Sequence, residues 1–201
     1  MKTLIIIDVQ NDFLPGGQLA VPHSEGIVNI INRIQSKFDL ILATQDWHPL
    51  NHQSFASNHS EKKVFDKIML HGLEQILWPN HCVQNTEGAN FPKELQTSRI
   101  EAIFRKGTDP EIDSYSAFYD NGHRKSTGLS GYLKEKKFTE LYFCGLAADV
   151  CVYSTITDAV AEGFECYLIE DATAPLDLHH YQELKQKMER MNVRIINSSS
   201  I

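Results

Sequence analysis

Six short apolar runs restrict the folds that this chain can adopt. The first covers residues 4–7, Leu-Ile-Ile-Ile, which are four apolar and mostly β-branched residues without any polar alternation. Runs of this kind are typical of parallel strands that are covered on both faces. Comparable runs follow at residues 40–44, 102–104, 141–144, 165–169 and 193–196. We therefore expect a sheet whose strands are buried on both sides.

Helical patterns lie between most of these runs. Residues 24–37 place isoleucines at 27, 30, 31 and 34 on one face, and helices are also expected at 128–137, 152–161 and 179–191. Strands that alternate with helices predict a parallel sheet with right-handed crossovers. The expected fold class is therefore α/β, a three-layer α/β/α arrangement with a six-stranded, mostly parallel, Rossmann-like sheet.

One long segment interrupts this alternation. Residues 45–98 carry no clear strand and are rich in His, Asn, Pro and Trp, and short helices are expected at 73–77 and 93–96. A connection of this length inside a compact domain is usually functional or partly helical. With 201 residues, the chain is expected to form a single domain, 1–201, with residues 45–98 inserted into it.

Charge and cysteine usage exclude several classes of function. The net charge is −7 and no basic block stands out, which disfavours nucleic acid and anionic membranes as partners. The four cysteines form no CxxC pair, so we expect buried free thiols and no disulfide reductase activity. The apolar run near the N-terminus is too short for a signal peptide, so a cytoplasmic location is the default expectation. The sequence leaves open whether the chain forms a homo-oligomer.

Polar residues follow four of the expected strands, at the point where each strand ends. Asp8 ends the first, Asp46 and His48 follow the second, Lys106 follows the third, and Cys151 follows the fourth. Ligands of parallel sheets bind beyond the carboxyl ends of the strands. The convergence of these side chains on one edge of the sheet predicts an active site there.

Cys151 is the predicted nucleophile of this site. It follows a turn rich in small residues and stands at the start of an expected helix, whose free N–H groups would favour the thiolate. Asp8 could take the thiol proton, Lys106 could supply a cation that orients Asp8, and the Cys151 N–H with another from the turn could form an oxyanion hole. Taken singly, these residues could instead be a packed thiol, a strand-end cap and a surface lysine.

A second group of side chains has the chemistry of a metal site. One carboxylate and three imidazoles suit a borderline divalent ion such as zinc, iron or manganese. The candidate ligands are Asp46, His48, His52 and His81. Histidines in long loops can also simply be solvated, and the thiol of Cys82, which follows His81, is expected to be packed.

Aromatic residues occur in loops that leave the same edge. Each could serve local packing, but several around one pocket would suit a flat ring stacked between side chains. They are Phe13, Trp47, Trp78, Tyr115, Phe118 and Tyr119.

Six segments, in this order, carry a resemblance to a known family. They are residues 4–13, 44–49, 77–83, 104–107, 115–118 and 145–151. With them the chain resembles the isochorismatase-like cysteine hydrolase family over essentially its whole length. The two His-bearing segments resemble those of the nicotinamidase branch of this family. They distinguish it from the isochorismatase branch, which lacks this metal site.

The resemblance implies hydrolysis of nicotinamide to nicotinate and ammonia in NAD salvage, with a thioester on Cys151 as intermediate. Another small amide, such as pyrazinamide, or a non-catalytic metal-binding module are the alternatives. The resemblance also implies one divalent metal, zinc before iron or manganese, bound to the substrate ring nitrogen.

The residues implied by the resemblance fall into four sets. The catalytic triad is Asp8, Lys106 and Cys151, and the oxyanion hole consists of the N–H groups of Ala147 and Cys151 after a cis peptide at Leu146–Ala147. The metal ligands are Asp46, His48 and His81, with His52 either a ligand or a neighbour of the ligands. The residues around the substrate ring are Phe13, Trp78 and Tyr115.

Overall fold

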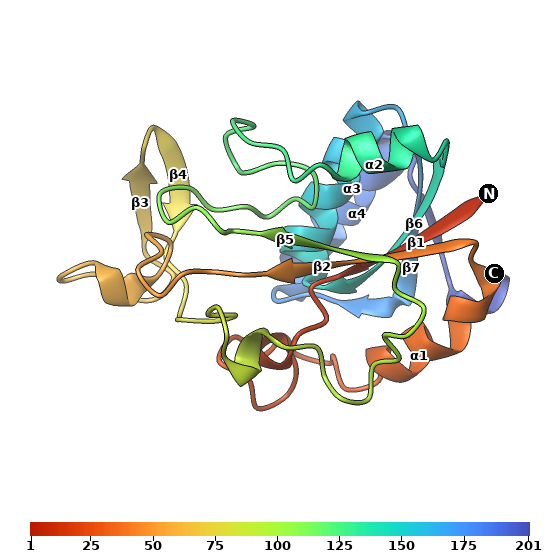
Figure 1. Ribbon diagram of the computed structural model, residues 1–201. Helices are drawn as coiled ribbons and strands as arrows, with labels where there is room; N and C mark the ends of the chain where they lie inside the picture. The colour runs from red at the N-terminus through yellow and green to blue at the C-terminus, as the bar shows by residue number, and fades with distance from the viewer.

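The computed structural model describes residues 1–201 and has a six-stranded parallel sheet at its centre (Figure 1). The strand order is β5-β2-β1-β6-β7-β8, and every neighbouring pair is parallel. The strands are β1 Lys2–Ile7, β2 Leu40–Asp46, β5 Ala102–Lys106, β6 Glu140–Leu146, β7 Glu165–Ala174 and β8 Arg194–Ile196. The predicted six-stranded α/β sheet is thus confirmed.

Helices cover both faces of the sheet. Helix α1 lies on one face, and α2, α3 and α4 lie on the other (Figure 1). Their bounds are α1 Ile27–Ile34, α2 Leu129–Glu135, α3 Tyr153–Ala161 and α4 Leu178–Arg190. The four predicted helices are all present, and their bounds lie within a few residues of the expected ones.

The first strand shows why an apolar run without alternation is needed here. Leu4 and Ile6 point into the core beneath α1, whereas Ile5 and Ile7 point into the core beneath α2, α3 and α4. All four side chains are fully buried. Since successive strand residues face opposite sides, a central strand between two helical layers has no position for a polar side chain.

The segment 45–98 differs from its prediction. Leu73–Ile76 is strand β4, not a helix, and it pairs antiparallel with β3, Lys67–Leu70. The two strands are joined by His71 and Gly72, which both have positive φ angles of 48° and 85° and so form the tight turn that matches strand twist. No helix forms at 93–96 either, where the chain makes a turn.

The carboxyl ends of the strands point away from both chain termini (Figure 1). The β3–β4 hairpin extends beyond this carboxyl edge, together with the loop after β5, whereas residues 94–96 run back beside α1 (Figure 1). No helix of the chain is long and apolar enough to cross a bilayer.

Candidate active site

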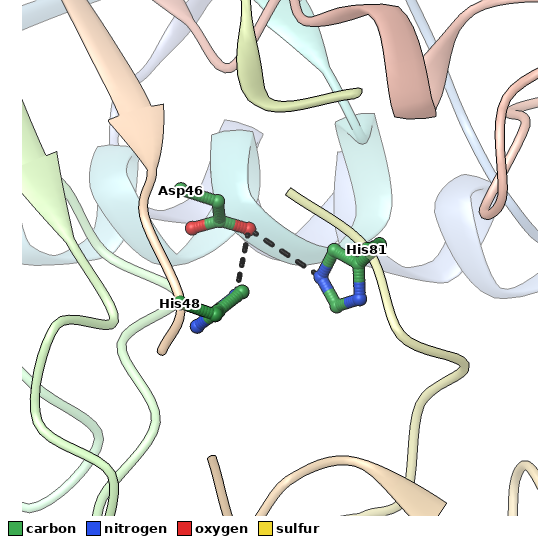
Figure 2. A group of neighbouring side chains, drawn as sticks. All are labelled: Asp46, His48 and His81. Atoms are coloured by element: carbon green, nitrogen blue, oxygen red, sulfur yellow. Dashed lines mark ion pairs between the residues drawn. The ribbon is translucent and has the colours of Figure 1, made fainter. Parts of the chain in front are cut away.

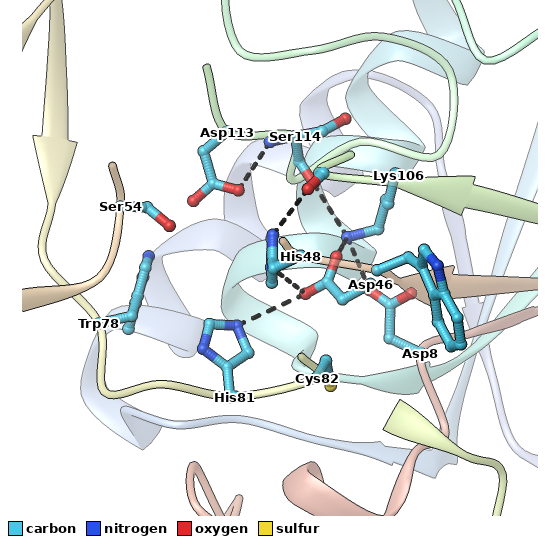
Figure 3. Close-up of polar contacts among 12 residues, drawn as sticks. Asp8, Asp46, His48, Ser54, Trp78, His81, Cys82, Lys106, Asp113 and Ser114 are labelled. Atoms are coloured by element: carbon cyan, nitrogen blue, oxygen red, sulfur yellow. Dashed lines mark hydrogen bonds and ion pairs between the residues drawn. The ribbon is translucent and has the colours of Figure 1, made fainter. Parts of the chain in front are cut away.

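Lys106, the last residue of β5, lies at the centre of the polar groups at the carboxyl edge (Figure 3). Its Nζ is 2.8 Å from Asp8 Oδ2 and also pairs with Asp46 Oδ1. It donates to the Ser114 carbonyl at 3.0 Å and lies 3.4 Å from Cys151 Sγ. The structure therefore brings Asp8, Lys106 and Cys151 together, as predicted, and excludes a surface role for Lys106.

Burial and ion pairing set the charges in this group. Burial lowers the pKa of Lys106, but Asp46 and Asp8 outweigh it and hold that pKa well above its usual range. For Asp46, burial raises the pKa, but Lys106 and His48 outweigh it and hold the pKa well below its usual range. The Asp8 pKa is raised by burial, which Lys106 opposes only in part. The group thus combines a permanent ammonium with a carboxyl, Asp8, that readily accepts a proton.

One oxygen of Asp8 is fixed and the other is turned toward the lysine. Asp8 has a positive φ of 47° just after β1, which turns the chain out of the strand. Its Oδ1 accepts a 2.6 Å hydrogen bond from the Thr44 hydroxyl, and its own N–H donates back to that hydroxyl at 3.1 Å. The remaining oxygen, Oδ2, faces Lys106 and is therefore the one available for proton transfer.

Cys151 lies in a tight turn between β6 and α3. The peptide Leu146–Ala147 is cis, as the resemblance implied, and Ala148–Val152 form a single π-helical turn before α3 begins at Tyr153. Gly145 is required before this turn, because a Cβ there would lie 2.0 Å from the Ile7 carbonyl oxygen of the neighbouring strand.

Burial sets the charge state of the thiol. Cys151 is 5% exposed, and burial raises its pKa well above the ordinary value, with Lys106 opposing the shift. The predicted effect of a helix start is thus outweighed by desolvation. The resting group is a protonated thiol, which makes a neighbouring base such as Asp8 necessary for nucleophilic attack.

Asp46, His48 and His81 form a compact group of potential metal ligands (Figure 2). Asp46 Oδ2 lies 3.5 Å from His48 Nε2 and 3.7 Å from His81 Nε2. The other ring nitrogens, Nδ1, contact the Gly107 and Pro79 carbonyl oxygens at 2.9 and 2.8 Å. Each Nδ1 therefore carries the proton that it donates, and each Nε2 presents a lone pair.

The donor set fits a divalent metal ion. His48 Nε2 is buried without a hydrogen-bond partner, which is costly for a polar atom unless a ligand satisfies it. One carboxylate and two neutral imidazoles are ligands that zinc, iron and manganese share. Three protein ligands leave further coordination positions open, which is the pattern of functional metal sites.

His52 lies beside this group, in a second cluster with His48 and Asp113. Its Nδ1 accepts a hydrogen bond of 3.1 Å from the Ser54 N–H, so the neutral ring carries its proton on Nε2. A protonated Nε2 has no lone pair for a metal ion. Burial lowers the His52 pKa to about 4, so the ring is neutral at physiological pH. This hydrogen bond favours a place for His52 among the neighbours of the ligands.

Replacing Gly107 with alanine is expected to weaken metal binding. An added Cβ would lie 2.3 Å from Cε1 and 2.5 Å from Nδ1 of His48, so the imidazole must move from its place beside Asp46. Displacing an orienting partner of a ligand typically costs 10- to 100-fold in metal affinity, about the loss expected here. Competition with a chromophoric chelator for Zn²⁺ measures it.

Gly128→Ala is the matched control for this variant. Gly128 also has a positive φ, 93° against 62° for Gly107, but no atom lies within 4 Å of its added Cβ. Both variants therefore carry backbone strain, and only Gly107→Ala disturbs His48. Equal Zn²⁺ affinities for the two variants would contradict this role of Gly107.

A pocket of about 320 Å³, its mouth included, connects the thiol with the potential metal ligands. Trp78 and Tyr115 are held by a 3.2 Å hydrogen bond from the indole Nε1 to the tyrosine hydroxyl. The lining residues are Phe13, Leu19, Asp46, Trp78, His81, Asp113, Tyr115, Ala147, Val150, Cys151 and Leu176. The three aromatics implied by the resemblance all line this pocket, whereas Trp47, Phe118 and Tyr119 do not.

Four lining residues were missed by sequence reasoning. Leu19, Val150 and Leu176 are ordinary aliphatic residues, and Asp113 is one acidic residue in a polar loop. Nothing in their local sequence separates them from core or surface residues. Leu19, Val150 and Leu176 follow β1, β6 and β7, which are neighbours in the sheet, whereas Asp113 lies in the loop after β5.

The fold and this site agree with a known family. The model of the isochorismatase domain matches residues 2–200, so the chain belongs to the isochorismatase family. Among its relatives, a nicotinamidase of Acinetobacter baylyi is 46% identical over 199 residues, covering 98% of this chain and 93% of that protein.

Solved structures show the same similarity. A nicotinamidase and pyrazinamidase of Acinetobacter baumanii superposes with a TM-score of 0.96 at 44% identity, covering 99% of this chain and 97% of that one. A pyrazinamidase of Pyrococcus horikoshii in complex with zinc gives a TM-score of 0.80 at 34% identity, with 98% of both chains covered.

Proposed function

We propose that the protein is a nicotinamidase, which hydrolyses nicotinamide to nicotinate and ammonia and thereby supplies NAD salvage. One observation carries the proposal. Cys151 and two of the three potential metal ligands, Asp46 and His81, line one small pocket with aromatic walls. The similarity to nicotinamidases over nearly the whole chain supports the same substrate. The chain acts as a single domain, 1–201, in which the inserted segment 45–98 supplies His48 and His81.

The reaction begins with proton transfer from Cys151 to Asp8. Asp8 suits this role because burial raises its pKa and because its Oδ2 is free of the Thr44 hydrogen bond. The ammonium of Lys106, 3.4 Å from the sulfur, stabilises the thiolate as it forms. The thiolate then attacks the carboxamide carbon.

The tetrahedral intermediate places its negative oxygen at the N–H groups of Ala147 and Cys151. Collapse of this intermediate breaks the carbon–nitrogen bond, and Asp8 returns its proton to the departing ammonia. A thioester on Cys151 remains. Asp8 then deprotonates a water molecule that attacks the thioester, which releases nicotinate and restores the thiol.

Asp46, His48 and His81 would hold a divalent ion, zinc before iron or manganese. When bound, the ion would supply a Lewis acid that fixes the ring nitrogen of the substrate. Phe13, Trp78 and Tyr115 enclose the flat ring from the other sides. The chain's own residues thus align the carboxamide with Cys151.

Removal of the metal is expected to reduce nicotinamide hydrolysis strongly and reversibly. Dialysis against a chelator should lower kcat/KM by about 100-fold or more, because the ring loses one of its anchoring contacts. Stoichiometric Zn²⁺, Mn²⁺ or Fe²⁺ should restore it. Unchanged activity in protein shown by elemental analysis to be metal-free would contradict a role for the ion.

Thr44 is expected to act on turnover and not on substrate binding. Thr44→Val removes the hydroxyl that holds Asp8 Oδ1 and should lower kcat by about 10- to 100-fold, the equivalent of one hydrogen bond to a charged group. KM should change little, because Thr44 does not line the pocket. Thr44→Ser keeps the hydroxyl and should retain most of the activity. Equal kcat values for the two variants would contradict this role.

The function is tested by incubating the purified protein with a panel of amides and identifying the acids formed. Nicotinamide should give nicotinate, with pyrazinamide as a slower or comparable substrate and aliphatic amides not hydrolysed. A clear preference for another amide would replace nicotinamide as substrate. No hydrolysis of any amide by metal-loaded protein would favour the alternative, a non-catalytic metal-binding module.

A further inference from the structure

Leu176 closes one side of the pocket from the loop between β7 and α4. It lines the pocket together with Ala147, Val150 and Cys151, which all belong to the turn that carries the nucleophile. Its side chain is partly buried against the core below α1. It therefore lines the pocket together with the turn that carries the thiol.

The backbone around Leu176 is fixed on both sides. Strand β7 pairs with β6 up to Ala174, which lies opposite Leu146. Pro175 then restricts the backbone through its fixed φ angle. Asp177 caps α4 by accepting a 3.0 Å hydrogen bond from the His180 N–H. Only two residues, Pro175 and Leu176, lie between the end of the strand and the helix cap.

Asp149 joins this loop to the nucleophile turn. Its Oδ1 accepts the Leu176 N–H and its Oδ2 accepts the Asp177 N–H, both at 2.8 Å. Asp149 is 7% exposed and stands two residues before Cys151. Both carboxylate oxygens of Asp149 therefore fix the Leu176–Asp177 backbone relative to the turn that carries Cys151.

We propose that Leu176 is a specificity-determining residue that limits the substrate to primary carboxamides, and that Asp149 is the residue that positions it. The inference rests on the proposed amide hydrolysis and concerns the size of the group on the amide nitrogen. Leu176 and the turn leave room for –NH₂ beside the thiol, and an N-alkyl group meets the leucine side chain. Recognition of the substrate ring by the metal ligands is independent of this selection on the amide nitrogen.

Three variants test this assignment. Leu176→Ala removes most of the side chain, and Asp149→Asn replaces one of the two acceptor oxygens by an NH₂ group that cannot accept. Leu178→Ala is the control, because Leu178 lies two residues further on, is 64% exposed and does not line the pocket. The substrates are nicotinamide, N-methylnicotinamide and 6-methylnicotinamide, and the acids formed are quantified by chromatography.

The readout is each substrate's kcat/KM relative to that of nicotinamide. For Leu176→Ala this ratio should rise about tenfold or more with N-methylnicotinamide, since removing a few methylene groups from a pocket changes discrimination by that order. Asp149→Asn should shift the ratio in the same direction by less. Leu178→Ala should leave it unchanged, and 6-methylnicotinamide should gain in none of the variants.

The possible failures are distinguishable. If the wild-type protein releases no acid from any of the three amides, the proposed function falls and the specificity assignment falls with it. If the wild-type protein hydrolyses nicotinamide but Leu176→Ala leaves the N-methyl ratio unchanged, only the assignment of Leu176 is wrong. A proportional loss of activity on all substrates in Asp149→Asn would show a merely structural role for Asp149.

Discussion

Replacing Cys151 with alanine is expected to abolish nicotinamide hydrolysis, with kcat reduced by at least about 10⁴-fold. The substitution removes the only sulfur in the pocket and leaves Asp8 and Lys106 without the group on which they act. The fold should persist, because alanine fits a site that the cysteine already fills within the core. Nicotinate formation measured over hours provides the sensitivity that this loss requires.

Cys144→Ala is the matched control for the loss of a buried thiol. Cys144 is fully buried in β6, seven residues before Cys151, and its sulfur contacts only the core and the Ile5 carbonyl oxygen at 3.8 Å. It should keep nearly full activity. The two variants should also bind Zn²⁺ equally, since neither sulfur belongs to the group Asp46, His48 and His81. A Cys151→Ala protein that retains more than a few per cent of wild-type kcat would exclude the thioester route.

Replacing Lys106 with methionine is expected to have the largest effect on stability. Methionine is unbranched like lysine and one atom shorter, and it leaves Asp8 and Asp46 without a cation. Removing one partner of a buried ion pair typically costs about 3–5 kcal/mol, and here two carboxylates lose the same partner. The raised pKa of Lys106 has the same cause, since the folded protein favours the charged form.

Urea unfolding of metal-free protein measures this effect, because a bound ion would replace part of the lost charge. Lys125→Met is the control: Lys125 pairs with Asp109 at 2.8 Å, but its side chain is 69% exposed, so its loss should change the free energy of unfolding very little. Lys106→Met should also lose most of its activity even when folded, because the thiolate loses its stabilising charge. A free energy of unfolding like that of Lys125→Met would contradict the central place of Lys106.

The parts of the fold that depend on local patterns were predictable. The run 4–7 identified a central strand because both of its faces pack against helices, and each strand-end residue followed from where such a run stops. Since parallel strands end on one edge, the sequence alone could place Asp8, Lys106 and Cys151 together.

Other features depend on contacts between distant segments. The β3–β4 hairpin has only a His71–Gly72 turn as its signal, and the positive φ of a histidine is not evident from sequence. The protonated state of Cys151 follows from its burial, which no local pattern shows. The tautomer of His52 depends on one backbone hydrogen bond from Ser54. Leu176 lines the pocket from a loop whose backbone is bonded to Asp149, and no local pattern shows this contact.

We propose that Cys151, with Asp8 and Lys106, hydrolyses nicotinamide in the pocket beside Asp46, His48 and His81. The most direct test is the rate of ammonia release from nicotinamide by metal-loaded wild-type protein, measured beside Cys151→Ala under the same conditions. The proposed chemistry predicts steady release of ammonia with an equal amount of nicotinate from the wild-type protein and none above background from the variant. Equal rates for the two proteins, or no release from either, would contradict it.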